Sequence, residues 1–230
     1  MTKEKVSIKQ FVRNQVKKWD RMYAQAERET EPRLPTITLS MEPGSGGSIL
    51  AQKIADRLDF DLFNRAIVEA IGKSAEIRET VIETLEKDRL SGVEDFIASL
   101  VKDYYIHPDI YLEHLLKVIN TIAQHGHAVI VGRGANFILP AHEKFAVRVI
   151  APLEIRIRNV ARAYKVSEED AKRRVIRRES RRKAFVRHSF NADISDPLQY
   201  DMVVNTGKMS IAAAVEAVIA AVMASLVSNP

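Results

Sequence analysis

The sequence predicts an α/β fold in which a mostly parallel sheet is covered by helices on both faces. Short runs of β-branched and other apolar residues alternate with longer segments whose apolar residues recur at helical spacing. The runs are apolar at nearly every position, as in the strands of parallel sheets that are buried on both faces. A glycine-rich loop separates the first run from the helix after it, which is a strand–loop–helix unit typical of α/β folds.

Residues 1–34 are predicted to form a helical arm that precedes the core. Apolar residues between Ile8 and Tyr23 recur near helical spacing, and Pro32 and Pro35 mark a break after them. The arm could pack on the body of the same chain or on a neighbouring subunit. It is therefore also a candidate surface for a homo-oligomer.

Residues 35–228 are predicted to form the core. The predicted strands are 36–40, 60–63, 128–131, 145–151 and 200–205. Helical patterns connect them: one directly after the glycine loop, a long stretch from about residue 65 to 105, one that ends at Gly126, the charged region 153–190 and an alanine-rich C-terminal helix.

The segment Ile211–Val227 is the most apolar part of the chain, but it predicts a buried helix rather than a membrane span. It contains Glu216 and is shorter than the roughly 20 apolar residues that a membrane-spanning helix needs. The chain has no cysteine, which excludes disulfides and thiolate-bound metal centres. A cytoplasmic location is the expectation that agrees with this composition.

The net charge of +5 is concentrated in one segment, residues 172–187, which holds nine basic residues and a single acid. Ser167–Asp170 forms a capping pattern before this segment, so a helix is predicted. Arg174, Arg178 and Arg182 then share one face at fourfold spacing. A solvated charged face is the simplest interpretation. Acidic partners at helical spacing are nearly absent, however, so a bound polyphosphate or nucleic acid would relieve the repulsion.

The loop after the first strand, MEPGSGGS, predicts a phosphate-binding site. Its three glycines let the backbone turn tightly and leave N–H groups free to point at an anion, at the positive end of a helix dipole. A plain tight turn is the alternative, because short glycine patterns are common. The residues expected to hold the phosphates of a nucleotide are Gly44, Ser45, Gly46, Gly47 and Ser48.

This loop departs from the standard P-loop, G-x-x-x-x-G-K-[ST]. Gly47 stands where the lysine belongs, and Ile49 stands where the Mg²⁺-binding hydroxyl belongs. Neither residue can replace the missing group. Ser45 or Ser48 could supply a hydroxyl, and a basic residue from elsewhere could supply the charge.

A second motif, Gly132-Arg133-Gly134, follows directly after the strand 128–131. Ligands in open α/β sheets collect beyond the carboxyl ends of the strands, and an arginine there is well placed to bind a phosphate through two parallel N–H groups. The alternative is an ion pair between Arg133 and a nearby carboxylate.

Together these motifs make the sequence similar to the cytidylate kinase-like branch of the nucleoside monophosphate kinases. The resemblance covers roughly residues 35–220 and rests on the order of the motifs rather than on any one of them. One departure is Gly134, which stands where ordinary cytidylate kinases have an acidic residue. The motifs are Ser40–Gly47, Phe63–Arg65, Val131–Leu139, the basic segment, Phe190-Asn191, Asp196-Pro197, Tyr200-Asp201 and Asn205-Thr206.

The resemblance implies a P-loop kinase-like three-layer α/β/α fold with a helical acceptor-binding insertion at 64–126 and an arginine-rich lid at 153–196. It implies phosphoryl transfer from ATP to a nucleoside monophosphate, with CMP or dCMP as the default acceptor. Mg²⁺ is expected with ATP, although no protein ligand for it can be named. The implied roles are acceptor binding for Arg65 and Arg133, and closure over the transferring group for Arg178, Arg182 and Arg187.

Two other functions stay open at this point. A nucleotide-binding regulatory protein with weak or no kinase activity would account for the altered glycine loop. A nucleic-acid binder would use the basic helix 172–187. The slightly acidic remainder of the chain and the lack of a series of stacking aromatic residues disfavour this second alternative.

Overall fold

The computed structural model describes residues 8–26, 35–85, 87–103 and 109–227, so both ends of the predicted arm lie outside the described residues. The predicted parallel sheet is confirmed. Its strands are β1 (Thr36–Met41), β2 (Asp61–Phe63), β3 (Ala128–Val131), β4 (Lys144–Ile150) and β5 (Met202–Asn205). They lie in the order β2-β3-β1-β4-β5, and every neighbouring pair is parallel. The central strand, β1, therefore leads directly into the glycine loop.

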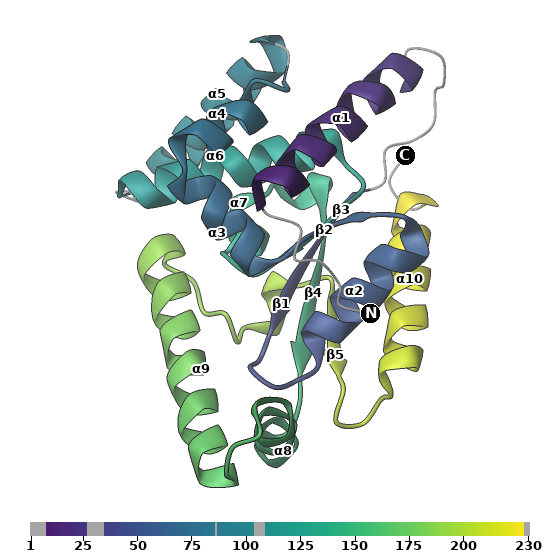
Figure 1. Ribbon diagram of the computed structural model, residues 1–230, viewed down its shortest axis with the longest axis vertical. Coiled ribbons are helices and arrows are strands. Elements are labelled where there is room, and N and C mark those ends of the chain that lie inside the picture. Colours follow the sequence, from purple (N-terminus) through teal and green to yellow (C-terminus); the bar gives the residue numbers. More distant parts are fainter. Residues whose placement is uncertain (1–7, 27–34, 86, 104–108, 228–230) are drawn as a thin grey trace.

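Helices connect the strands as the sequence predicts (Figure 1). They are α1 (Ile8–Ala26), α2 (Gly47–Leu58), α3 (Arg65–Lys73), α4 (Ala75–Ile82), α5 (Lys87–Asp103), α6 (Ile110–His125), α7 (Ala135–Ile138), α8 (Leu153–Tyr164), α9 (Glu168–Phe190) and α10 (Ile211–Val227), with 3₁₀ turns at Ala141–Glu143 and Pro197–Gln199.

The long helical stretch predicted from about residue 65 to 105 is divided into α3, α4 and α5. Ser74 ends α3, and its side-chain hydroxyl accepts a hydrogen bond from the N–H of Ile77 at 3.4 Å in the first turn of α4. A serine that caps a new helix fixes extended backbone angles at that point, so one continuous helix cannot form.

One face of the sheet is covered by α2 and α10, which lie together beside it (Figure 1). Leu50 and Ile54 of α2 and Val218 of α10 are buried in one cluster with Ile37 and Leu39 of β1. The apolar C-terminal segment is thus a core helix, as predicted. Among the described helices, none has both the length and the apolar character that a bilayer span requires.

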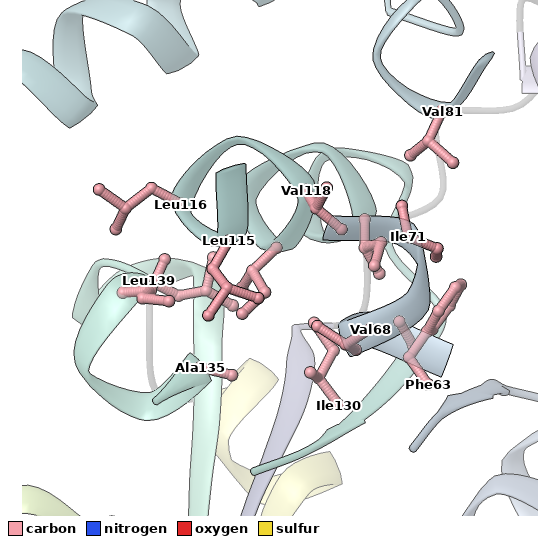
Figure 2. Close-up of a cluster of buried hydrophobic side chains, with 14 of the residues drawn as sticks. Phe63, Val68, Ile71, Val81, Leu115, Leu116, Val118, Ile130, Ala135 and Leu139 are labelled. Carbon is pink, nitrogen blue, oxygen red and sulfur yellow. The ribbon is translucent and has the colours of Figure 1, made fainter. Parts of the chain in front are cut away.

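The helices of the predicted insertion cover the opposite face. Figure 2 shows Ile71 of α3 and Leu115 and Val118 of α6 packed above Ile130 of β3 in a second buried cluster. Ala135, at the start of α7, belongs to the same cluster. The sheet therefore has helices on both faces, which confirms the predicted three-layer α/β/α arrangement.

The described part of the arm, α1, packs on the body of its own chain. Trp19 is buried, and its ring stacks on that of His125 at 3.8 Å between centroids. Gln15 and Lys18 donate hydrogen bonds to the carboxylate of Asp61 at 2.7 and 3.1 Å. The apolar side of this helix is thus covered by the same chain, and a homo-oligomer through the arm stays a prediction.

The charged region after β4 forms two helices, α8 and α9, that pack through a small cluster containing Ile157 and Val175. α8 lies beyond the end of β4, and α9 runs from there back toward α3 (Figure 1). The predicted cap is confirmed, because the Ser167 hydroxyl accepts a hydrogen bond from the N–H of Asp170 at 3.1 Å. The basic segment is therefore one long helix whose first turn is acidic.

Candidate active site

A cavity of about 290 Å³ lies at the carboxyl ends of β1 and β3, between α7 and α9. This is the place where ligands bind in open α/β sheets. Its lining includes Arg65, Arg133, Arg178, Arg181, Arg182, Phe137 and Phe185. The structure thus brings together four of the five arginines that were predicted for the site, from three separate parts of the chain.

The glycine loop adjoins this cavity through Met41, while Gly44–Ser48 lie outside the cavity lining. Gly44 and Gly46 have φ angles of 85° and 80°, in the left-handed region that favours glycine. A Cβ atom on Gly44 would lie 2.4 Å from the backbone carbonyl oxygen of Arg156 in α8. The loop is therefore packed directly against α8, and only glycine fits at position 44.

The loop offers a group of unused hydrogen-bond donors. The N–H groups of Gly44, Gly46, Gly47 and Ser48 have no acceptor in the described part of the chain. By contrast, the Ser45 N–H and hydroxyl both donate to the Glu42 carbonyl, at 3.2 and 2.9 Å. Free N–H groups at the first turn of a helix form an anion site, because the helix dipole adds to their positive charge. This geometry fits the predicted phosphate-binding loop.

The place of the missing lysine is filled by Met41. A Cβ atom on Gly47 would lie 2.7 Å from the Met41 Cβ and 2.8 Å from its Sδ. Gly47 is in the first turn of α2 and does not have a positive φ. The obstacle to a larger residue at position 47 is therefore the Met41 side chain and not the backbone conformation.

The described residues do not fit a Mg²⁺ site of the P-loop type. Ile49 has no oxygen to offer, and the Glu42 carboxylate already accepts the Ala151 N–H at 3.0 Å and lies 3.3 Å from Arg156 Nε. No group of three or more metal-ligating side chains occurs among the residues that the structure describes. Mg²⁺ commonly binds mainly through substrate phosphates and water, so its presence with ATP stays a prediction from the family resemblance.

Arg133 lies in the left-handed region, with a φ angle of 55°, between two glycines that also have positive φ. Its Nη2 donates a hydrogen bond to Glu69 of α3, and its Nε is buried without a partner. The ion-pair alternative is thus present in this structure. The unused Nε leaves a donor for an incoming anion, and the acceptor-binding role of Arg133 stays a prediction.

Glu69 connects Arg133 to the other predicted acceptor-binding residue, Arg65. Its carboxylate lies 3.6 Å from Arg65 Nε and 2.9 Å from Lys73 Nζ. The hydrogen bond from Lys73, together with Arg133 and against the effect of burial, lowers the pKa of Glu69 to about 2. Glu69 is therefore ionised at neutral pH and neutralises part of the positive charge around the cavity.

Arg182 reaches from α9 to the start of the glycine loop, where its Nη1 donates a hydrogen bond to the Met41 carbonyl oxygen. Burial, with repulsion from Arg65, Arg148 and Arg178, lowers the pKa of Arg182 to about 10. Its guanidinium is therefore still charged at neutral pH, although the surroundings disfavour the charge.

The other arginines of α9 differ in their contacts and in their distance from the cavity. Arg174 and Arg178 lie over the ring of Tyr164 in α8, at 5.6 and 5.1 Å from its centroid. These cation–π contacts give two of the basic residues a partner on α8 that the sequence did not predict. Arg187 is exposed near the end of α9 and does not line the cavity, so the structure does not bring it to the other predicted residues.

One contributor that the sequence analysis missed is Arg156, which is buried between the loop and α9. Its Nε lies 3.3 Å from the Glu42 carboxylate, and its Nη1 donates to Glu179 at 2.8 Å. We call these three residues the Arg156 cluster. It joins the glycine loop to both α8 and α9. Nothing in the local sequence pattern relates these positions, which lie far apart along the chain.

A second missed residue is Arg148 of β4, which is buried next to the cavity. Its Nη1 donates to the Ser40 hydroxyl at 2.8 Å, and its guanidinium lies 5.9 Å from the Tyr200 ring centroid. It makes no ion pair with any described residue. The signal that could have found it is a charged residue within the otherwise apolar run 145–151.

Comparison with known proteins agrees with the motifs and the fold. The sequence pattern of the cytidylate kinase-like family matches residues 36–208. The cytidylate kinase of Pyrococcus horikoshii is 27% identical over 174 residues, which cover 76% of this chain and 81% of that protein. The cytidylate kinase of Ignicoccus hospitalis is 27% identical over 185 residues, covering 80% and 97%. An uncharacterized protein from Eubacterium ventriosum has a similar solved structure, with a TM-score of 0.63 at 18% identity over 82% of this chain and 98% of that one.

Proposed function

Because this chain belongs to the cytidylate kinase-like family, we propose that it transfers a phosphoryl group from ATP to a nucleoside monophosphate, with CMP or dCMP as the default acceptor. The observation that carries the proposal is the placement of an arginine-lined cavity next to a loop with four free N–H groups. Two anion sites side by side are what a kinase needs for its donor and acceptor phosphates.

The chemistry requires positioning and charge neutralisation rather than a general base. The phosphate of a nucleoside monophosphate is already an anionic nucleophile at neutral pH, so no group must remove a proton from it. In this proposal Gly44–Ser48 hold the donor phosphates, and Arg133 and Arg65 hold the acceptor phosphate. Arg178 and Arg182 neutralise the charge on the transferring group.

The larger divisions of the chain fit the same scheme. Residues 64–126 are proposed as the acceptor-binding insertion, and 153–196 as a lid that closes over the phosphates. Closure would exclude water and so suppress hydrolysis of ATP. Arg187 would take part only if the end of α9 moved toward the cavity, because it now lies outside the lining. In this proposal ATP is the donor substrate, the nucleoside monophosphate is the acceptor substrate, and the protein is located in the cytoplasm.

The proposal is tested by measuring ADP release, coupled to a spectroscopic readout, with ATP, Mg²⁺ and one monophosphate at a time. The panel includes CMP, dCMP, UMP, AMP and GMP, and ATP alone gives the background. We expect release above background with at least one acceptor and the highest kcat/KM with CMP or dCMP. ADP release that no acceptor raises above background would contradict kinase activity.

Arg133→Ala is predicted to affect the acceptor more than ATP. Loss of a charge-assisted contact should raise the acceptor KM about 10- to 100-fold, while the ATP KM changes less than about twofold. Arg177→Ala is the matched control, because Arg177 is exposed on α9 and does not line the cavity. Equal changes in both KM values would place Arg133 outside the acceptor site.

The regulatory alternative is favoured by Gly47 and Ile49, which remove the standard lysine and hydroxyl from the loop. It predicts that ATP raises the melting temperature, because a ligand stabilises the state that it binds, while no acceptor supports ADP release. The thermal shift and the turnover assay together therefore separate this function from the kinase.

A nucleic-acid-binding role receives less support from the structure. Arg178, Arg181 and Arg182 line the cavity, so part of the basic face is directed to the proposed active site. Arg173 pairs with Glu169 and Asp170, both at 2.6 Å. Binding to generic RNA or DNA that weakens steeply with salt would favour this role instead.

A further inference from the structure

We propose that Arg182 of α9 brings to the glycine loop the positive charge that a lysine at position 47 brings in a standard P-loop. This inference rests on the proposed function, in that ATP is taken as the ligand of the loop. It goes further by assigning neutralisation of the donor phosphates to Arg182, a residue of α9 and not of the loop itself.

The first observation is that Met41 occupies the space next to Gly47, the position of the lysine in a standard P-loop. A side chain on Gly47 would meet Met41 Cβ and Sδ at 2.7 and 2.8 Å. A Cβ atom essentially never lies so close to another heavy atom, and the Met41 Cβ cannot rotate away. A lysine at position 47 therefore requires the Met41 side chain or the loop backbone to shift.

The second observation is that a positively charged side chain of α9 contacts Met41. Arg182 donates a hydrogen bond to the backbone carbonyl of Met41, the residue whose side chain packs against Gly47. The guanidinium is thus held at the first position of the loop, on the cavity side, since both residues line the cavity. One residue, Met41, both crowds position 47 and binds the arginine.

The third observation is the kind of partner that Arg182 has. Arg133 pairs with Glu69, and Arg156 pairs with Glu42 and Glu179. Arg182 forms no ion pair in the described part of the chain, and a neutral carbonyl is its hydrogen-bond acceptor. A phosphate oxygen is a stronger acceptor than a carbonyl, so exchange of one for the other favours binding of the anion. The other arginines around Arg182 add to this preference.

The turn after β5 offers a competing source of charge. The Thr206 hydroxyl donates to the Ser45 carbonyl at 2.6 Å, which places this turn against the glycine loop. Lys208 follows two residues later and is exposed. It makes no hydrogen bond or ion pair through its side chain to any described residue. Lys208 therefore serves as the rival in the test.

The consequence is that the donor site of this protein is shared between two elements. Backbone N–H groups come from the loop, and the side-chain charge comes from α9 in the lid region. Full affinity for ATP then requires α9 to be in place, whereas a lysine on α2 would be present whatever the position of the lid.

The first part of the test is calorimetric titration with the Mg²⁺ complex of a non-hydrolysable ATP analogue. Arg182→Ala is expected to weaken binding about 10- to 100-fold, and Arg182→Lys to weaken it less, because the charge remains. Arg177→Ala and Lys208→Ala are expected to change the dissociation constant less than about twofold. Unchanged binding by Arg182→Ala, or a loss with Lys208→Ala instead, would overturn the inference.

The second part moves the charge back to the loop. Met41→Gly removes all three Met41 atoms that crowd position 47 and keeps the backbone carbonyl. Adding Met41→Gly and Gly47→Lys to the Arg182→Ala variant is expected to recover at least about tenfold of the lost affinity. Circular dichroism and a melting curve show that each variant is folded. A folded triple variant with no recovery would overturn the inference, since the missing charge would then not be the cause of the loss.

Binding and turnover distinguish failure of this inference from failure of the proposed function. If the wild-type chain binds the analogue in an Arg182-dependent way but phosphorylates no acceptor, the inference stands and the kinase proposal fails. If it turns over an acceptor while Arg182→Ala binds the analogue normally, the kinase proposal stands and the inference fails. If the wild-type chain does not bind the analogue, both fail.

Discussion

Gly44→Ala is expected to lower the free energy of unfolding by about 2 kcal/mol or more and to abolish measurable ATP binding. Position 44 has a φ angle of 85°, and an added Cβ would lie 2.4 Å from the Arg156 carbonyl oxygen. That oxygen belongs to the backbone of a packed helix, so it cannot rotate away as a side chain could. The loop must therefore shift, which moves the free N–H groups that are proposed to bind the phosphates.

The matched control is Gly92→Ala. Gly92 lies within α5, and an added Cβ would meet no heavy atom within 4 Å. Alanine is favoured over glycine inside a helix by about 0.5–1 kcal/mol, so this variant should be slightly stabilised. Chemical denaturation gives the stabilities, and calorimetry with ATP gives the affinities. Equal stability and equal ATP affinity of the two alanine variants would contradict the close contact between the loop and α8.

Arg156→Ala is expected to cost about 3 kcal/mol of unfolding free energy at neutral pH. Removal of the guanidinium leaves the Glu42 and Glu179 carboxylates without the cation that lies between them. Lys183 remains 3.3 Å from Glu179, but Glu42 has no second cation among the described residues. The loss should also raise amide exchange in α9, because the contact through Arg156 between Glu42 of the loop and Glu179 of that helix is gone.

The same variant should show a pH dependence of known sign. Burial alone would raise the pKa of Glu179, but hydrogen bonds from Arg156 and Lys183 outweigh it and lower the pKa. A carboxyl group with a lowered pKa stabilises the fold above its unfolded pKa, and this contribution is lost as the pH falls through the folded pKa. The difference in stability between wild type and Arg156→Ala should therefore shrink below pH 4.5, the ordinary value for glutamate.

Denaturant unfolding at several pH values measures this difference. Arg158→Ala is the control on the same helix, because Arg158 is exposed and forms no ion pair among the described residues. It should change stability by less than about 0.5 kcal/mol at any pH. A difference for Arg156→Ala that stays constant down to pH 3 would show that lost packing, and not charge, causes the destabilisation.

The sheet could be predicted from the sequence because its signals are local. Ile37 and Leu39 alternate with threonines in a short run that is followed by a glycine-rich loop, and Ala128–Val131 is apolar at every position. A parallel strand that is buried on both faces needs this composition, whatever the rest of the chain does. The Ser167 cap could be predicted for the same reason, because the hydrogen bond joins residues three apart.

The site could be predicted only in part, because its geometry depends on contacts between distant residues. Arg133 was found through its two flanking glycines, but its partner Glu69 lies 64 positions away. The Arg156 cluster joins residues 42, 156 and 179, and the packing of Met41 on Gly47 depends on the shape of the loop. A local sequence pattern does not show which distant residues come into contact in the fold. The break at Ser74 was missed for a different reason, since serine is tolerated inside helices as well as at their starts.

The packing of Met41 against Gly47 also constrains how this protein can evolve. A single substitution of Gly47 by lysine meets the Met41 side chain, so selection acts against it before any benefit to phosphate binding is seen. A smaller residue at position 41 must come first, and that change alone removes apolar contacts without adding a charge. The two positions are therefore epistatic, and the order of mutations decides which descendants are reachable. A lineage that acquired this methionine is expected to keep glycine at position 47.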